Sequence, residues 1–521
     1  MPTDRALQFV VDGDQMSVPD DGASLLEVLR DRLGIRSPKD GCSPQGQCGC
    51  CTVLVDGQAR VACVTPARRV AGREITTLDG MDEATRAEWA DAFTACGASQ
   101  CGFCTPGIIV RLESLRRRDG DLTDRTSVDR ALAAHLCRCT GWNSIREAAI
   151  VVSGGDLARG DQSGGGPARD LEAASLRAAI EGRGPQRVAA DVALGAGGFA
   201  DDSAPLDALV AVPDGAGGWS VAETLAAARA LSGKIQGRRT TVPPAPPLEV
   251  PPGDWAVTLA TSWVEPAYLE VDASWCEPGG EPASPLANGG AFGGKSTSPL
   301  PEVARRLADE HGRAVRALWA REDVVREGPK RPPVSAGLDA DGGGIVRVVE
   351  TPGVAATIAA VLPAVTVEPL TVAGPPTSLH LRAAGLAEAH ALASALAGRP
   401  LPFRTVDGAV AEAEATDGRI VVRVSCGDPL DEIVLRSYCV GAAHMAWSMV
   451  TSESLSVAPD GTIGDLTVRS FGIVRSADMP PVDVEILPSD GRPVNGSDAV
   501  FVAVTSAAWA ARGFGPTWPT G

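Results

Sequence analysis

The chain has no long apolar run, no excess of basic residues and few aromatic side chains. No stretch of 18 apolar residues occurs in its 521 residues, so we expect no membrane span. The formal net charge of −18 disfavours binding to the phosphate backbone of nucleic acids. Only two residues are tyrosine, and the Gly-, Ala- and Pro-rich composition indicates a genomic bias more than a function.

Secretion and histidine-based metal sites are also disfavoured. Residues 1–10 lack the charged-then-apolar pattern of a signal peptide, so we expect a cytoplasmic protein. Its 13 cysteines are too sparse for a secreted scaffold built on disulfides. The histidines show no metal-ligand spacing, and we expect surface or core roles for all five, which are His135, His311, His380, His390 and His444.

Eight cysteines in the first 140 residues fall into two sets of four. Three cysteines of the first set lie in residues 41–51 (GCSPQGQCGCC), and the fourth follows twelve positions after the last of them. The members of this set are Cys42, Cys48, Cys51 and Cys63. The second set lies in residues 100–107 (QCGFCTPG) and 135–142 (HLCRCTGW); its members are Cys101, Cys104, Cys137 and Cys139. Four thiolates are the full complement of a [2Fe–2S] cluster. The sequence therefore predicts two such clusters and the transfer of single electrons.

Zinc and disulfides are the alternatives for these cysteines. Disulfides do not suit the expected compartment, whereas zinc stays open for the second set. The first set lies in a glycine-rich loop with the spacing C-x5-C-x2-C, one residue longer than the usual plant-type C-x4-C-x2-C. We assign Cys48 and Cys51 as ligands because they keep the two-residue gap, which leaves Cys50 as a spare thiol.

The surroundings of each set predict a different domain. Around the first set, hairpins are expected at 7–18 and 51–64, and a capping box at Ser24–Glu27 opens a helix that Gly34 closes. This pattern indicates a β-grasp plant-type ferredoxin domain at 1–80. Around the second set, helices are expected at 84–96, 105–118, 127–136 and 143–152, with Thr105 as an N-cap. They indicate a four-helix [2Fe–2S] domain at 81–153.

The motif QCGFCTPG, followed by LCRCTGW, resembles the second iron–sulfur domain of the xanthine dehydrogenase/aldehyde oxidase family of molybdenum hydroxylases. The preceding ferredoxin block matches this family too, so the resemblance covers residues 1 to about 155. It implies that the first cluster lies outward and that the second lies beside a molybdopterin cofactor. It also implies that Gln100 and Cys139 touch the pterin.

Beyond a Gly/Ser/Asp-rich linker at 154–168, weak pieces resemble the molybdenum domain of the same family in the same order. They include residues 264–270, 289–295, 313–333, 384–404, 426–430, 441–455 and 460–481. The segment GGAFGGK resembles a loop that approaches the cofactor, through Gly289, Gly290, Gly293 and Gly294, and Lys295 is either a phosphate partner or a solvated lysine. We therefore expect an α+β multidomain protein, with a small α/β domain and a proline-rich exit at 169–253 and a mixed α/β, reduced molybdopterin-domain-like region at 254–521.

Parts of the family's cofactor site are shortened or altered in this chain. Only 18 residues separate Glu270 from Gly289, a far shorter stretch than the family has, and the stretch from Arg404 to Cys426 is also abbreviated. The catalytic glutamate of the family aligns with Asp498, whose side chain is one methylene shorter. A general base must reach the proton that it takes, so this change would be harmful. We expect a shrunken, cofactor-free domain.

Two functions follow from the resemblance. In the first, the chain is the iron–sulfur electron-transfer subunit of a multi-subunit molybdenum hydroxylase, with the molybdopterin on a catalytic partner chain. In the second, the chain is itself a compact catalytic hydroxylase that uses Asp498 as base. No FAD domain is present in the sequence, so electrons are expected to leave through a flavin subunit or an external acceptor.

Overall fold

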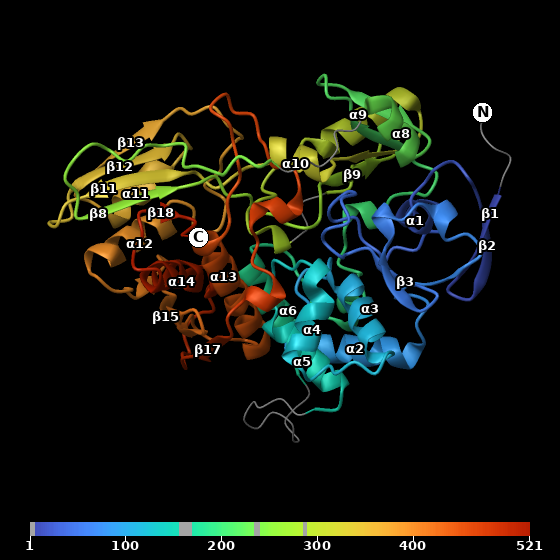
Figure 1. Ribbon diagram of the computed structural model, residues 1–521, viewed down its shortest axis with the longest axis horizontal. Helices are drawn as coiled ribbons and strands as arrows, with labels where there is room; N and C mark the ends of the chain where they lie inside the picture. The colour runs from blue at the N-terminus through green and yellow to red at the C-terminus, as the bar shows by residue number, and fades with distance from the viewer. Residues whose placement is uncertain (1–5, 156–168, 234–239, 285–288, 521) are drawn as a thin grey trace.

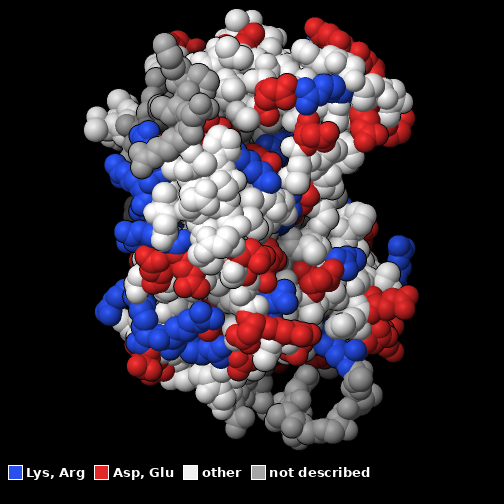
Figure 2. Space-filling view, turned by 90° about the vertical axis from the view of Figure 1, so that its right-hand side faces the viewer, with Lys and Arg blue, Asp and Glu red and all other residues white. Residues whose placement is uncertain are grey.

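The computed structural model describes residues 6–155, 169–233, 240–284 and 289–520. Its architecture is α+β and multidomain, as predicted, with iron–sulfur-type domains at the N-terminus. In Figure 1 the N-terminal sheet and helices lie at the right and bottom, and the later sheets lie at the left and top. Acidic and basic residues are interspersed on the face that carries the N-terminal sheet (Figure 2). Within the described ranges, no helix has both the length and the apolarity to span a membrane.

The N-terminal sheet has the order β2-β1-β5-β3-β4 and contains both predicted hairpins. Its strands are β1 (Ala6–Val11), β2 (Asp14–Pro19), β3 (Thr52–Val55), β4 (Gln58–Val61) and β5 (Glu74–Thr76). Leu7, Phe9 and Val11 alternate into the core, which is the period of a strand with one buried face. The second strand of the second hairpin ends at Val61, earlier than expected, and a 3₁₀ turn over Ala62–Val64 then carries Cys63.

The helix predicted after Ser24 is real but irregular. The Ser24 hydroxyl accepts the Glu27 backbone N–H at 3.2 Å, as the predicted cap requires. The α-helical part, α1, covers only Leu25–Glu27, and a π-helical turn continues over Val28–Arg32. Leu33 then caps the turn, one residue before Gly34.

Four helices form the second domain, as predicted. They are α2 (Glu83–Cys96), α3 (Thr105–Arg116), α4 (Arg125–Ala131) and α5 (Asn143–Val152). The third helix starts and ends earlier than predicted: Asp124 caps it, and a 3₁₀ turn over Leu132–Ala134 follows it. Thr105 is not the N-cap of α3; Cys104 holds that position, so a predicted cluster ligand sits at the start of this helix.

A small sheet with the order β7-β6-β10-β9 lies beside the N-terminal domain. Its elements are β6 (Leu209–Pro213), β7 (Trp219–Ala222), α8 (Leu225–Ser232), β9 (Ala273–Cys276), α9 (Leu300–His311) and β10 (Val315–Leu318). Leu209 pairs with Val315 in parallel, so the sheet joins strands from both sides of the boundary that we placed at residue 253. The helix α10 (Arg321–Glu327) follows β10.

Two more sheets and two long helices make up the C-terminal half. The sheet β13-β12-β11-β8-β18 contains β8 (Val257–Thr261), β11 (Val334–Leu338), β12 (Gly344–Val349), β13 (Val365–Leu370) and β18 (Thr517–Trp518). The sheet β14-β15-β16-β17 contains β14 (Phe403–Arg404), β15 (Val410–Thr416), β16 (Arg419–Ser425) and β17 (Val482–Ile486). The long helices are α13 (Glu432–Thr451) and α14 (Ser497–Ala511), and the shorter α6 (Leu171–Gly182), α11 (Val354–Val361) and α12 (Leu386–Leu396) pack in the same half. The short helix α7 (Ala190–Ala193) instead contacts α2. Almost every side chain of α13 is buried, so it forms the centre of this half.

Candidate metal centres

The first four cysteines converge although they lie on a loop and a separate turn. All four are buried, at 3% exposure or less. The thiol of Cys42 contacts those of Cys48 and Cys63, and these contacts lower the pKa of Cys42. Cys63 also contacts Cys51, and its hydrogen bonds with Cys42 and Cys51 raise its own pKa. The backbone N–H groups of Gln45 and Cys63 point at the sulfurs of Cys42 and Cys51, at 3.3 and 3.4 Å. Such N–H···S bonds tune the potential of a cluster.

The second four cysteines converge in the same way. The sulfurs of Cys101 and Cys139 are 3.8 Å apart. Cys137 contacts both Cys139 and Cys104, and these contacts lower the pKa of the Cys137 thiol. Three of these thiols are buried, whereas Cys101 is half-buried.

The geometry of both sets fits a [2Fe–2S] cluster. In the described part of the chain, no three His, Cys, Asp or Glu side chains are grouped so as to hold a metal ion. Each set of thiols instead forms a row of contacts, in the order Cys48–Cys42–Cys63–Cys51 in one and Cys101–Cys139–Cys137–Cys104 in the other. A row of four sulfurs suits two bridged irons, whereas zinc needs its ligands around one ion. The arrangement of the eight thiols is therefore compatible with two [2Fe–2S] clusters.

The two sets are joined directly by the backbone. The carbonyl of Cys48 accepts the N–H of Leu136, which precedes Cys137, at 3.0 Å. Beside this bond, the His135 imidazole lies 3.2 Å from the Thr52 hydroxyl and packs against Gly49. A Cβ at Gly49 would come within 2.4 Å of the imidazole ring, so glycine is required for this close approach. Burial lowers the pKa of His135 to about 3, so its ring is neutral there.

Cys50 lies next to the first set, and its thiol contacts that of Cys48 at the end of the row. Its sulfur is 3.8 Å from the carbonyl of Cys48. We expect a Cys50→Ala variant to keep both clusters, because the other four cysteines already supply four thiolates and the Cys50 thiol contacts only that of Cys48. Iron and sulfide content, with the EPR spectrum of the reduced protein, checks this. Loss of the first cluster in this variant would mean that Cys50 is a ligand.

Gln100 lies beside the second set of cysteines. Its amide nitrogen donates to the carbonyl of Cys139 at 2.7 Å and to the hydroxyl of Ser437, on α13, at 3.0 Å. Next to Ser437, the Tyr438 ring is 2% exposed. Burial raises the pKa of the Tyr438 hydroxyl, and the nearby thiols of Cys139 and Cys101 raise it further. A buried phenol therefore lies near Gln100 and the second set of cysteines.

The glycine loop is tightly packed against protein. A Cβ at Gly293 would lie 1.8 Å from the carbonyl of His380, and one at Gly294 would lie 2.9 Å from the Tyr268 ring. Lys295 is neither a phosphate partner nor a solvated lysine, because its ammonium is buried 3.0 Å from a carboxylate oxygen of Glu270. This ion pair links the segment that ends at Glu270 to the glycine loop that begins at Gly289, which are separated by only 18 residues in the sequence.

Asp498 is held by two arginines. Arg382 donates to it at 3.0 Å, and Arg183 pairs with its other oxygen. The Arg382 guanidinium is 3% exposed and stacks 4.1 Å from the ring of Phe292, inside the glycine loop. Burial lowers the pKa of Arg382, and Asp498 opposes this effect. Asp498 is thus an ion-pair partner of the buried Arg382 and of the more exposed Arg183.

The backbone donors next to Asp498 are also engaged. The Glu181 carboxylate, at the end of α6, accepts the N–H groups of Gly496 and Ser497 at 3.0 and 2.8 Å. Sequence motifs located Asp498 but missed Arg382, Glu181 and Tyr438, because the contacts of these residues depend on distant segments. Around the glycine loop and Asp498, the protein's own side chains occupy the space, which does not favour a molybdopterin there. Beside Gln100 and Cys101, in contrast, lies a cavity of about 360 Å³.

Comparisons with known proteins agree with the iron–sulfur assignment. Residues 77–150 match the family model described as [2Fe-2S] binding domain. A probable xanthine dehydrogenase subunit of Bacillus subtilis is 37% identical over 128 residues, which cover 25% of this chain and 73% of that protein. The xanthine dehydrogenase iron-sulfur-binding subunit of Escherichia coli O157:H7 is 43% identical over 127 residues, which cover 24% of this chain and 78% of that protein.

The similarity in fold extends further than the similarity in sequence. The aldehyde oxidoreductase of Desulfovibrio desulfuricans matches this structure with a TM-score of 0.67, 14% identity and coverage of 99% of both chains. This match shows a shared fold over both halves of the molecule. Together with the two relatives in sequence, it shows that the chain belongs to the xanthine dehydrogenase/aldehyde oxidoreductase family of molybdenum hydroxylases.

Proposed function

We propose that this chain is the electron-transfer component of a molybdenum hydroxylase and that it carries single electrons through two [2Fe–2S] clusters. The observation that supports this best is the direct hydrogen bond from Leu136 to the carbonyl of Cys48. It connects a predicted ligand of the first cluster to the residue beside Cys137, so electrons cross between the two sets over a short, buried route. The clusters supply reversible one-electron chemistry, and the cysteines hold them in place.

The comparisons and the contacts favour different positions for the molybdenum. The fold of a single-chain aldehyde oxidoreductase extends over this whole chain, which favours our second hypothesis, a self-contained hydroxylase, over the separate-subunit hypothesis. The side-chain contacts instead favour a molybdopterin outside this chain. Tyr438 lies near the thiols of Cys101 and Cys139, and Arg382 joins the glycine loop to Asp498.

On these contacts we place the molybdopterin on a partner chain. A fold can persist after its binding loops are lost, whereas a cofactor cannot share space with buried side chains. In this arrangement the C-terminal half of the chain serves as a scaffold for the catalytic partner. The self-contained hydroxylase stays the second candidate, and the whole-chain fold similarity is the observation in its favour.

EPR of the reduced chain tests the electron-transfer proposal. Two distinct rhombic signals are expected, one for each set of cysteines, with two irons and two sulfides for each signal. A single signal, or zinc at the second set, would refute the two-cluster proposal.

A further inference from the structure

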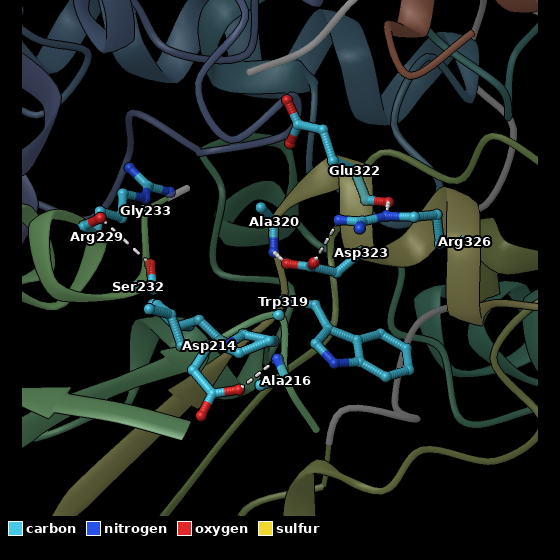
Figure 3. Close-up of a pocket in the computed structure, with 14 residues that line it drawn as sticks. Asp214, Ala216, Arg229, Ser232, Gly233, Trp319, Ala320, Glu322, Asp323 and Arg326 are labelled. Atoms are coloured by element: carbon cyan, nitrogen blue, oxygen red, sulfur yellow. Dashed lines mark hydrogen bonds and ion pairs between the residues drawn. The ribbon is translucent and has the colours of Figure 1, made fainter. Parts of the chain in front are cut away.

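A cavity of about 250 Å³ lies at the carboxyl ends of the parallel strands β6 and β10 (Figure 3). Crevices at this edge of a parallel sheet are the preferred ligand sites of α/β folds. Residues after β6, at the end of α8 and at the start of α10 line it, among them Asp214, Arg229, Trp319, Glu322, Asp323 and Arg326. Gly215 and Ala216 at its rim are exposed, so the cavity is accessible from solvent.

The walls of this cavity combine the Trp319 indole, which is 9% exposed, with two arginines and three carboxylates, those of Asp214, Glu322 and Asp323. The Trp319 indole forms part of the wall, and the side chains of Arg229 and Arg326 line the cavity on two sides (Figure 3). Arg326 is fixed by Asp323 at 3.1 Å. An indole offers a flat surface for stacking, and guanidinium groups donate hydrogen bonds to oxygen acceptors. The volume is below the ~300–1,000 Å³ of typical small-molecule sites, so it suits a ligand of one or two rings.

Two connections lead from this cavity to the first cluster. A cavity of about 30 Å³ shares Arg229, Leu318 and Trp319 with it, and on its other side is lined by the ligand Cys63. That volume is about the space of one water molecule. Trp319 and Cys63 therefore line the same small cavity.

The second connection is a chain of hydrogen bonds. Glu322, in the cavity wall, accepts the side-chain amide of Gln45 at 3.1 Å. The backbone N–H of the same Gln45 donates to the sulfur of Cys42 at 3.3 Å. Arg229 also donates to the hydroxyl of Ser43, the residue after Cys42, at 3.0 Å. A molecule in the cavity thus touches side chains that in turn touch the cluster loop.

We propose that this cavity binds a small quinone, which accepts electrons from the first cluster. The proposal rests on the electron-transfer function above and names the acceptor that this function needs. The ring stacks on Trp319, and its carbonyl oxygens accept hydrogen bonds from the arginines. Reduction of the quinone takes two electrons and two protons. Each reduced [2Fe–2S] cluster gives one electron and returns to its diferric form, and the protons come from solvent. The two carbonyls of the quinone become hydroxyls.

Stopped-flow oxidation of the reduced full chain by 1,4-naphthoquinone tests the proposal. The rate of cluster oxidation should saturate with quinone concentration, because a complex forms first. Trp319→Ala should weaken the apparent affinity about tenfold, through loss of the stacking surface. Ala216→Trp, at the exposed rim, should block the cavity and abolish saturation without touching the core. Trp275→Ala, on β9 of the same sheet, is the matched control, since its indole bonds to Ser203 and lies outside the cavity.

Quinone binding to the oxidised chain gives a readout that does not depend on electron transfer. Calorimetric titration should detect one site in the wild type and in Trp275→Ala, and a weakened site in Trp319→Ala. The cavity proposal would be overturned if the rate of cluster oxidation rose linearly with quinone concentration. It would also be overturned if Trp319→Ala and Ala216→Trp saturated at the same quinone concentration as the wild type. In that case, two intact EPR signals and unchanged oxidation by ferricyanide would leave the electron-transfer function standing. Absence of the clusters would instead refute the proposed function.

Discussion

Replacing Cys104 or Cys137 with serine is expected to abolish one of two EPR signals and to leave the other unchanged. Both cysteines belong to the second row of thiols, and Cys137 makes contacts with two of its members. A serine hydroxyl is a poor ligand for iron, so the cluster is lost or strongly altered. Replacing Cys51, which contacts Cys63 in the first row, should abolish only the other signal.

The control for these variants is Cys96→Ser, because Cys96 is a buried cysteine at the end of α2 outside both rows. It should retain both signals. Loss of both signals in Cys104→Ser, with the protein still folded by circular dichroism, would contradict the assignment of two independent sets.

Asp498→Ala is expected to lower the stability of the C-terminal half by about 3–5 kcal/mol, because it leaves the buried charge of Arg382 without its carboxylate. Denaturant unfolding of the full chain measures this, as an earlier transition of the C-terminal half. Asp483→Ala is the matched control, since Asp483 pairs with Arg419 on the surface and the two side chains are 50% and 64% exposed. That change should cost no more than about 1 kcal/mol.

The same variant separates a structural role from a catalytic one. In the complex with its native partners, Asp498→Ala should lose activity only in proportion to unfolded protein. If turnover disappears while the protein stays folded and both clusters remain, Asp498 is a base, and the self-contained hydroxylase takes the place of the scaffold.

The N-terminal domains could be predicted because their determinants are local. Each hairpin has its turn residues and its alternation within about a dozen positions, and each cysteine set has fixed spacings. The deviations are local as well. The turn after Val61 tightens into a 3₁₀ helix, and the helix after Ser24 widens into a π turn.

The C-terminal half was harder to predict because distant segments pair in it. Nothing near Leu209 indicates that it pairs with Val315, so the domain boundary at residue 253 could not anticipate the shared sheet. The motif order located Asp498 and the glycine loop. It could not show that Arg382 would connect them, since that contact depends on how three separate segments pack.

We propose that this chain holds two iron–sulfur clusters and no molybdenum. Metal analysis of each chain, after purification with the native partners, tests it most directly. We predict four irons and four inorganic sulfides on this chain, as two [2Fe–2S] clusters require, with molybdenum only on a partner chain. Stoichiometric molybdenum on this chain would contradict the account.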